Sequence, residues 1–323
     1  MSELARTEDQ LVEAAQRHWG LEGGDARLVA QRENSVWRLT HPRGSFALRL
    51  HRPGYRALAE LCSELDWMAC LDQGGLPVPA PLPAPDGTFV AELAPGRFAS
   101  VLTWLDGQPV GHLGHLAEGL DPAELSHAVG RQMAKMHDLS DAWVPPPGFS
   151  RPDWGRDGLV GEAPLWGPFW THPDLNDKQQ TMLQELRSKA DELLAEMEGT
   201  ADQGLIHADI LGENVMHLPS GVLAFIDFDD CAHGYRTFEL ATWLLKFTDR
   251  PYAADMRSAL LEGYAARREV SGDELDFFLL LRALTYVGWI IPRMTEPGGA
   301  DRSRRMLDQA LRRAKNFLER TSR

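Results

Sequence analysis

The sequence predicts an α+β fold of two lobes, with a small antiparallel sheet lobe over residues 1–105 and a larger, mainly helical lobe over residues 106–323. Strand-like runs separated by Pro and Gly turns are concentrated before residue 105, and helical periodicity dominates after residue 122. The change of character falls at a turn, Leu105-Asp106-Gly107. At 323 residues with 43% apolar content, the chain is long enough for two lobes with a sizeable core.

The first lobe should open with a helix over residues 7–19. Thr7 can cap it, acidic residues occupy its first turn, and apolar residues recur at helical spacing up to Trp19. The other expected elements are two strands joined by a Pro-Gly turn, one helix, and two strands that follow a proline-rich loop: residues 35–39, 45–50, 60–71, 88–93 and 98–104.

The second lobe should be built from helices, with an irregular tryptophan-rich stretch over residues 143–170. The segment 277–291 is strongly apolar but is interrupted by Arg282, and its length predicts a buried helix rather than a membrane span. By periodicity, the expected helices are residues 122–138, 179–198, 238–248, 253–268, 274–291 and 302–320.

The segment 205–230 contains the candidate catalytic and metal-ligating residues. His207, Asp209 and Asn214 form a His-x-Asp-x-x-x-x-Asn run, and Asp227 follows a turn and the apolar run 222–226, which reads as a strand. An aspartate can accept a hydroxyl proton, and amide and carboxylate oxygens are the hard ligands that Mg²⁺ requires. An isolated Asp-x-x-x-x-Asn is usually a solvated loop. The spacing, the flanking strands and the turn together favour a phosphotransferase site.

Composition and charge restrict the classes of ligand and the cell compartment that this protein is expected to have. The formal net charge of −14 argues against nucleic acid, whose phosphates would be repelled, and would suit a cationic acceptor. Three widely spaced cysteines give neither a disulfide framework nor a metal-ligand pattern, which is typical of a cytoplasmic protein. The N-terminal residues do not resemble a signal peptide.

With these residues in place, the chain resembles the aminoglycoside phosphotransferase family, over roughly residues 31–286 and most strongly over residues 205–245. Relatives in that family include choline, homoserine type II and hydroxylysine kinases and a bacterial stress-response Ser/Thr kinase. The resemblance implies a protein-kinase-like fold that binds ATP in the crevice between its lobes. It also implies transfer of the γ-phosphoryl group to a hydroxyl of a small molecule.

The resemblance assigns roles residue by residue. Asp209 would be the catalytic aspartate, with His207 supporting its loop, and Asn214 and Asp227 would be the Mg²⁺ ligands. The run that contains Glu239 matches the family's acidic-Leu-Ala helix, in which the acidic residue is usually Asp.

In the first lobe, the resemblance places ATP-binding groups on two neighbouring strands and a helix. Arg49 stands where the family has its ATP-binding Lys, and Glu64 matches the usual acidic partner of that Lys. Asn34 and Ser35 lie in a turn, residues 32–35, where protein kinases have a glycine-rich loop over the phosphates. Backbone groups of residues 102–107 should contact adenine.

The acceptor is the least determined part. Candidate pocket walls are polar and aromatic residues close to the motif or on the late helix: Asp230, Tyr235, Glu239, Trp243 and Trp289. The loop 154–170 is a candidate lid. For each of these residues, a packing role is favoured over a role in specificity.

Three functions therefore stay open: a small-molecule hydroxyl kinase, a Ser/Thr protein kinase of the stress-response type, and a catalytically silent nucleotide-binding protein. The short interval from Asp227 to Glu239 leaves little room for a protein-kinase activation segment. The presence of Asp209, Asn214 and Asp227, the three polar residues that the reaction requires, disfavours a catalytically silent protein.

Overall fold

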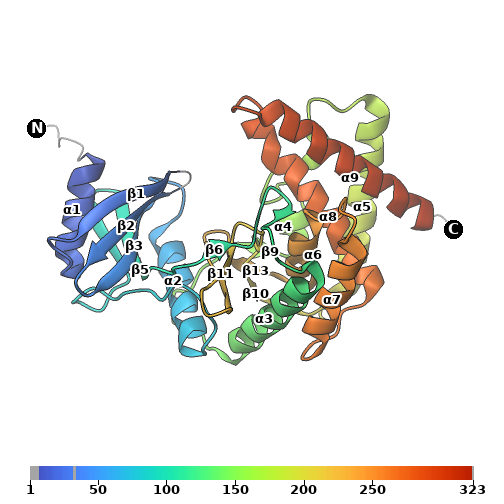
Figure 1. Cartoon of the computed structure of the whole chain (residues 1–323). Helices are drawn as coiled ribbons and strands as arrows, with labels where there is room; N and C mark the ends of the chain where they lie inside the picture. Colours follow the sequence, from blue (N-terminus) through green and yellow to red (C-terminus); the bar gives the residue numbers. More distant parts are fainter. Residues whose placement is uncertain (1–6, 32–33, 322–323) are drawn as a thin grey trace, which may run out of the picture. The chain divides into compact units, whose positions relative to one another are not determined.

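The structure is a computed structural model, and it describes residues 7–31 and 34–321. The chain forms two compact units, each made of three segments (Figure 1). Unit 1 comprises Met1–Pro109, Leu139–Arg151 and Val215–Asp229, and unit 2 comprises Val110–Asp138, Pro152–Asn214 and Asp230–Arg323. Unit 1 thus contains the whole of residues 1–105 together with two segments from later in the sequence. The proposed boundary at residue 105 stays a prediction.

Unit 1 is built on a five-stranded antiparallel sheet with the strand order β1-β2-β3-β5-β4. In that order along the sheet, its strands are Asp25–Gln31, Ser35–His41, Gly44–Leu50, Arg97–Thr103 and Val90–Ala94. The four strands from residue 35 onward match the predicted runs to within a few residues. β1 was not predicted, because its side chains are mostly exposed and do not show the alternation of a half-buried strand.

Helix α1 (Glu8–Trp19) supplies one side of the core of this sheet. The predicted cap is present, since the Thr7 hydroxyl accepts the Gln10 N–H and the Gln10 side chain accepts the Thr7 N–H. Leu11, Ala15 and Trp19 are buried together with the inward-facing residues of β3 and β5. The spacing of apolar residues that predicted the helix therefore also determines which of its faces is buried.

Helix α2 (Leu58–Gln73) connects the sheet to the later segments of unit 1. Trp67 is fully buried on this helix, where its indole N–H donates to the Ser140 hydroxyl at 2.9 Å. The same ring packs edge-on against Phe228, with 5.4 Å between centroids. The hairpin of β11 (Val215–His217) and β12 (Leu223–Phe225) completes the unit, and β11 also pairs with β6 (Gln108–Pro109).

Unit 2 is mainly helical, as predicted. Its regular helices, the first of which ends in unit 1, are α3 (Pro122–Ala142), α4 (Arg156–Val160), α5 (Asp177–Met197), α6 (Arg236–Leu245), α7 (Ala253–Ala265), α8 (Gly272–Ile290) and α9 (Gly299–Thr321), with 3₁₀ turns at Phe169–Thr171 and Ile291–Arg293. The predicted helix 238–248 begins two residues earlier and ends three residues earlier than expected.

Helix α8 forms the core of unit 2 and packs against α6 and α9. The helix is longer than the predicted run 277–291, and by length and composition alone Gly272–Arg293 could cross a membrane. However, 78% of its apolar window is buried inside the protein, and this burial accounts for its apolar character.

Short strands position the loops of unit 2. β10 (Gln203–Ile206) pairs antiparallel with β13 (Ala232–Tyr235), which pairs in parallel with β9 (Asp153–Trp154). A separate short hairpin is formed by β7 (Gly111–His112) and β8 (His115–Leu116). The loop that carries Asp209 leaves directly from the end of β10.

Candidate active site

The loop from His207 to Asn214 holds the Asp209 carboxylate from two sides. The Asn214 side-chain amide donates to Asp209 Oδ2 at 3.0 Å and to the Asp209 backbone oxygen at 2.9 Å. On the other side, Arg282 of α8 places Nη2 3.3 Å from Asp209 Oδ1. The Asp209 side chain is nevertheless 22% exposed, so a substrate can reach it. The spacing of Asp209 and Asn214 in the sequence thus produces a direct contact.

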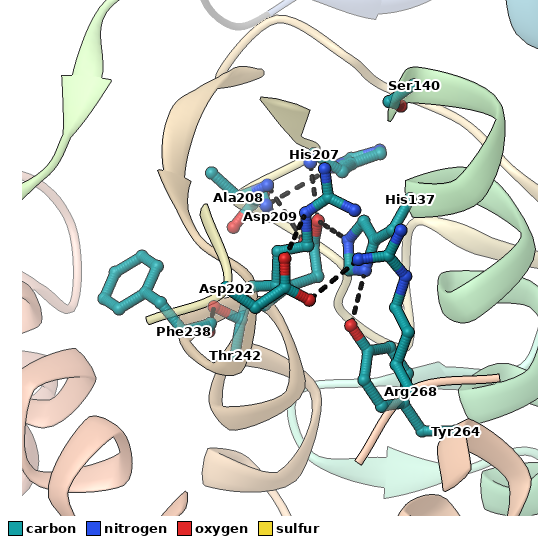
Figure 2. Close-up of polar contacts among 12 residues, drawn as sticks. His137, Ser140, Asp202, His207, Ala208, Asp209, Phe238, Thr242, Tyr264 and Arg268 are labelled. Atoms are coloured by element: carbon teal, nitrogen blue, oxygen red, sulfur yellow. Dashed lines mark hydrogen bonds and ion pairs between the residues drawn. The ribbon is translucent and has the colours of Figure 1, made fainter. Parts of the chain in front are cut away.

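The backbone of this loop is anchored by Glu239 of α6. Ala208 has φ +63°, a left-handed conformation that is uncommon for a residue other than glycine. In this conformation the N–H groups of His207 and Ala208 both donate to the Glu239 carboxylate, at 2.6 and 3.0 Å (Figure 2). Burial raises the pKa of Glu239 to about 8, although the two N–H donors act in the opposite direction. Backbone strain beside Asp209 is therefore stabilised by a buried acid.

His207 supports the loop from within. Its ring is fully buried, and Nδ1 accepts the Asp209 N–H at 3.3 Å, so the proton of a neutral ring lies on Nε2. Both the backbone and one side-chain atom of His207 therefore serve to fix the position of Asp209. The family resemblance implied such a supporting role for His207.

A polar network includes His137, Tyr264 and Arg268, and sequence reasoning did not identify it (Figure 2). His137 of α3 places Nε2 3.7 Å from Glu239 and pairs through Nδ1 with the Tyr264 hydroxyl at 2.8 Å. Burial lowers the pKa of His137 well below its ordinary value and raises that of Tyr264. Arg268 bridges Asp202 and Asp138, at 2.8 and 3.0 Å. These partners come from helices and loops distant in sequence, which is why no local pattern indicated them.

Unit 1 contains a buried ion pair between Arg49 and Glu64. Arg49 Nη1 donates to Glu64 Oε1 at 2.7 Å, and both side chains are almost fully buried. Burial alone would raise the pKa of Glu64, but the Arg49 charge holds it below its ordinary value. Arg49 Nε also lies 3.4 Å from the Ser100 hydroxyl, which contacts His51 at 3.0 Å. The predicted pairing of these two residues is confirmed, and its role toward a nucleotide stays a prediction.

The segment around Asp227 follows the predicted strand, now β12, and is held by arginines. Asp227 is exposed and has φ +67°, again in the left-handed region. Two residues later, the Asp229 backbone oxygen accepts from Arg56 Nη2 at 2.9 Å and from Arg151 Nη2 at 2.5 Å. Because the carbonyl is fixed by two cations, the backbone that presents Asp227 has little freedom.

A pocket of about 510 Å³ lies in unit 1 beside residues 104–108 and the hairpin residues 216–219. Arg38 lies over the Trp104 ring at 4.8 Å and contacts Asp106 at 3.2 Å. The pocket combines backbone groups of the predicted adenine-contacting segment with apolar side chains such as Met216. This combination suits a flat heteroaromatic base.

The predicted phosphate-contacting turn is only partly described, because Arg32 and Glu33 lie outside the described residues. The Ser35 hydroxyl donates to Glu8 of α1 at 2.9 Å and is buried, so we leave Ser35 out of the nucleotide site. The Asn34 side chain accepts the Arg52 N–H at 3.3 Å. Asn34 stays a candidate.

The predicted acceptor residues separate into two groups. Tyr235, Glu239 and Trp243 are buried in the core, and the Trp243 indole donates to Ser126 at 3.0 Å, so these three are unavailable to a substrate. Asp230 and Trp289 are only partly buried and stay candidates. The local sequence could not separate the groups, because aromatic residues line both cores and pockets.

The candidate lid is also revised. Trp154 is buried and stacks on Phe238, with 5.3 Å between centroids. A Cβ at Gly288 of α8 would collide with the backbone oxygens of Trp166 and Gly167, so this loop packs directly on α8. A loop in such close backbone contact is part of the core.

Each of the two proposed metal ligands, considered by itself, has an oxygen of the kind that Mg²⁺ binds. Asn214 uses its NH₂ group to contact Asp209, which leaves its carbonyl oxygen for a cation, and Asp227 offers a carboxylate. Within the described residues, no three His, Cys, Asp or Glu side chains form a metal-binding group. Mg²⁺ does not require one, because it is commonly held by one or two protein oxygens together with phosphates and water.

Comparisons with known proteins identify the family of this chain. The model of the phosphotransferase enzyme family matches residues 25–273. Homoserine kinase of Sinorhizobium medicae (strain WSM419) is 28% identical over 279 residues, which cover 83% of this chain and 79% of that protein. Homoserine kinase of Brucella abortus (strain S19) is 29% identical with the same coverage.

Solved structures show the same fold. A microcompartment-associated aminopropanol kinase has a TM-score of 0.81 and 25% identity, covering 97% of this chain and 98% of that one. An amicoumacin kinase, solved with AMP-PNP, Ca²⁺ and Ami, has a TM-score of 0.76 and 20% identity, covering 95% of this chain and 93% of that one. The α+β, protein-kinase-like fold predicted from the sequence is confirmed. With a family model that spans most of its length, the chain belongs to the phosphotransferase enzyme family and is a small-molecule kinase.

Proposed function

We propose that this protein transfers the γ-phosphoryl group of ATP, with Mg²⁺, to the hydroxyl of a short amino alcohol. The observation that carries the proposal is the Asp209 carboxylate, which is held on both oxygens yet is still 22% exposed. Amino alcohols are favoured because homoserine and aminopropanol, named for the relatives, share a hydroxyl and an amine on a short chain. A net charge of −14 also favours acceptors that carry a cation.

In the proposed reaction, Asp209 orients the acceptor hydroxyl and takes its proton late, as the new O–P bond forms and the bond to ADP breaks. Asn214 and Asp227 are the proposed metal ligands, and the bound cation would neutralise charge on the phosphates. Arg49, fixed by Glu64, is the proposed contact to the non-transferred phosphates. Asn34 is a candidate for a further contact.

The proposed adenine site is the unit 1 pocket next to residues 104–108. Asp230 and Trp289 are the remaining candidates for acceptor contacts. An aromatic face at Trp289 could hold a cationic amine, although Arg293 lies over this ring at 4.3 Å and would compete for one face. A cytoplasmic location and a lack of nucleic-acid or membrane partners stay predictions, supported by the acidic charge and the three free thiols.

The test is an acceptor screen with matched pairs. The protein is incubated with ATP, Mg²⁺ and homoserine or 1-amino-2-propanol, and each acceptor is paired with an analogue that lacks a free hydroxyl, O-methylhomoserine or isopropylamine. We expect a phosphomonoester by ³¹P NMR and mass spectrometry from the hydroxyl compounds alone. Chelation by EDTA should stop the reaction, and added Mg²⁺ should restore it.

Choline, an aminoglycoside and a general protein substrate complete the panel. A product from the aminoglycoside alone would redirect the acceptor class. A labelled protein with no small-molecule product, or tight nucleotide binding without transfer to any acceptor, would contradict the proposed function.

A further inference from the structure

Arg282 of α8 is a buried cation with an unusual environment. Its side chain has no exposed surface, and its guanidinium carbon lies 4.4 Å from the centroid of the Trp166 ring, 4.5 Å from Tyr286 and 5.0 Å from Phe238. We call Trp166, Phe238 and Tyr286 the aromatic cage. An arginine cannot lose its proton in a protein, so this charge is permanent and must be compensated inside unit 2.

The compensation comes from one carboxylate and three ring faces. Arg282 Nη2 lies 3.3 Å from Asp209 Oδ1 and 3.2 Å from the Tyr286 hydroxyl. Nε and Nη1 are buried and have no hydrogen-bond partner within the described residues, as expected for a guanidinium enclosed by the negative faces of aromatic rings. The cage therefore fixes the guanidinium in space and leaves a single edge of it directed at Asp209.

We propose that Arg282 is a positioning residue for the reaction, and that it sets the orientation of the Asp209 carboxylate. This inference rests on the proposed function. Asn214 restrains Oδ2 and Arg282 restrains Oδ1, so the plane of the carboxylate is determined from both sides. The 3.3 Å separation is long for a charge-assisted hydrogen bond, typically about 2.7–2.9 Å. Arg282 therefore orients Asp209 through a contact that is longer than a typical charge-assisted hydrogen bond.

The aromatic cage explains why the pairing can remain this loose. A carboxylate held in a tight bidentate pair with an arginine would have few lone pairs left for a hydroxyl. Because three rings already stabilise part of the charge, Arg282 does not need a second carboxylate or a closer contact.

The first test is the split between kcat and KM in the Arg282→Met variant, which keeps the length of the side chain and removes the charge. We expect kcat to fall by about tenfold or more, while KM for ATP stays within about twofold. Arg282→Lys retains a cation in the aromatic cage, and it should recover most of the lost kcat.

Arg187→Met is the matched control. Arg187 of α5 also lies over a tryptophan, Trp170 at 4.4 Å, but it donates to the Val160 carbonyl rather than to a catalytic carboxylate. This variant loses a comparable stacked cation in the same unit, and its kcat should not fall. Tyr286→Phe keeps the ring and should change kcat less than about threefold. An unchanged kcat in a folded Arg282→Met protein would overturn the proposal.

A second measurement is independent of catalysis. The unfolding equilibrium constant is measured in urea for the wild type, Arg282→Met, Asp209→Asn and the double variant. Arg282→Met changes the unfolding equilibrium constant by some factor in the wild-type background and by another factor in the Asp209→Asn background. We expect these two factors to differ by at least about fivefold. Zero coupling would contradict the pairing. If no acceptor is phosphorylated by the wild type, the proposed function fails, whereas the coupling still decides whether Arg282 and Asp209 interact.

Discussion

Arg49 in unit 1 and Arg282 in unit 2 are both buried beside a carboxylate, and the two arginines are stabilised differently. In unit 1, Arg49 forms a 2.7 Å ion pair with Glu64, whose side chain has no exposed surface. In unit 2, Arg282 is enclosed by the aromatic cage and approaches Asp209 only to 3.3 Å. A carboxylate that only neutralises a charge can be buried and closely paired. A carboxylate that must meet a substrate is left partly exposed and loosely paired.

The largest effect should come from breaking the close pair. Glu64→Met leaves Arg49 buried without its carboxylate, and we expect a loss of about 3–5 kcal/mol in the free energy of unfolding. The double variant Arg49→Met/Glu64→Met removes both charges and should be more stable than the single variant. Urea unfolding of the three proteins measures this. A cost below about 1 kcal/mol for Glu64→Met would show that water or another group compensates Arg49.

Asp209→Asn tests the loosely paired carboxylate. The amide preserves the shape of the side chain but cannot accept the hydroxyl proton, so kcat should fall by about a hundredfold or more. Nucleotide affinity, measured by calorimetry, should change little, because Asp209 is not assigned to ATP. Normal turnover in this variant would remove Asp209 from the mechanism.

Glu239→Gln sharpens the comparison, because this buried carboxylate is bound to backbone N–H groups rather than paired with an arginine. A Gln side chain has one acceptor oxygen, so one of the two N–H groups loses its partner, at a cost of about 1–3 kcal/mol at pH 6.

The pH dependence of this variant has a definite sign. The folded pKa of Glu239 is about 8, above its ordinary value of 4.5, so the folded state binds the proton more tightly. As the pH rises toward 8, the contribution of this proton to the wild-type free energy of unfolding is lost, by about 1.4 kcal/mol per pH unit. The difference between wild type and Glu239→Gln should therefore narrow from about pH 6 to about pH 8 in urea unfolding. A constant difference would contradict the raised pKa.

The smallest effect concerns His51, beside the Arg49–Glu64 pair. Burial, with the Arg49 charge, lowers the pKa of His51 to about 3. Between pH 6.5 and about pH 3, the unfolded state takes up a proton and the folded state does not. The free energy of unfolding therefore decreases as the pH is lowered through this window. His51→Gln removes the titrating group. On lowering the pH to about 5.5, the free energy of unfolding of this variant should therefore fall by about 1.4 kcal/mol less than that of the wild type. An identical acid slope in both proteins would rule out this contribution.

Local sequence patterns determined most of the secondary structure and the centre of the site. Helix α1 followed from a cap and apolar spacing, and Asp209 and Asn214 were found because their spacing of five residues in one loop brings them into contact. These features depend on residues close in the chain, whose geometry is set by backbone dihedrals and short-range hydrogen bonds.

The tertiary structure alone decided which polar residues support that site and which aromatic residues are core. Arg282 is separated from Asp209 by 73 residues, and Glu239 from His207 by 32, so no local period relates them. Trp243 looked like a pocket wall and is buried, since a ring in a core and a ring in a pocket have the same chemistry. Long-range packing determines burial, and burial determines whether a side chain holds the loop or meets the substrate.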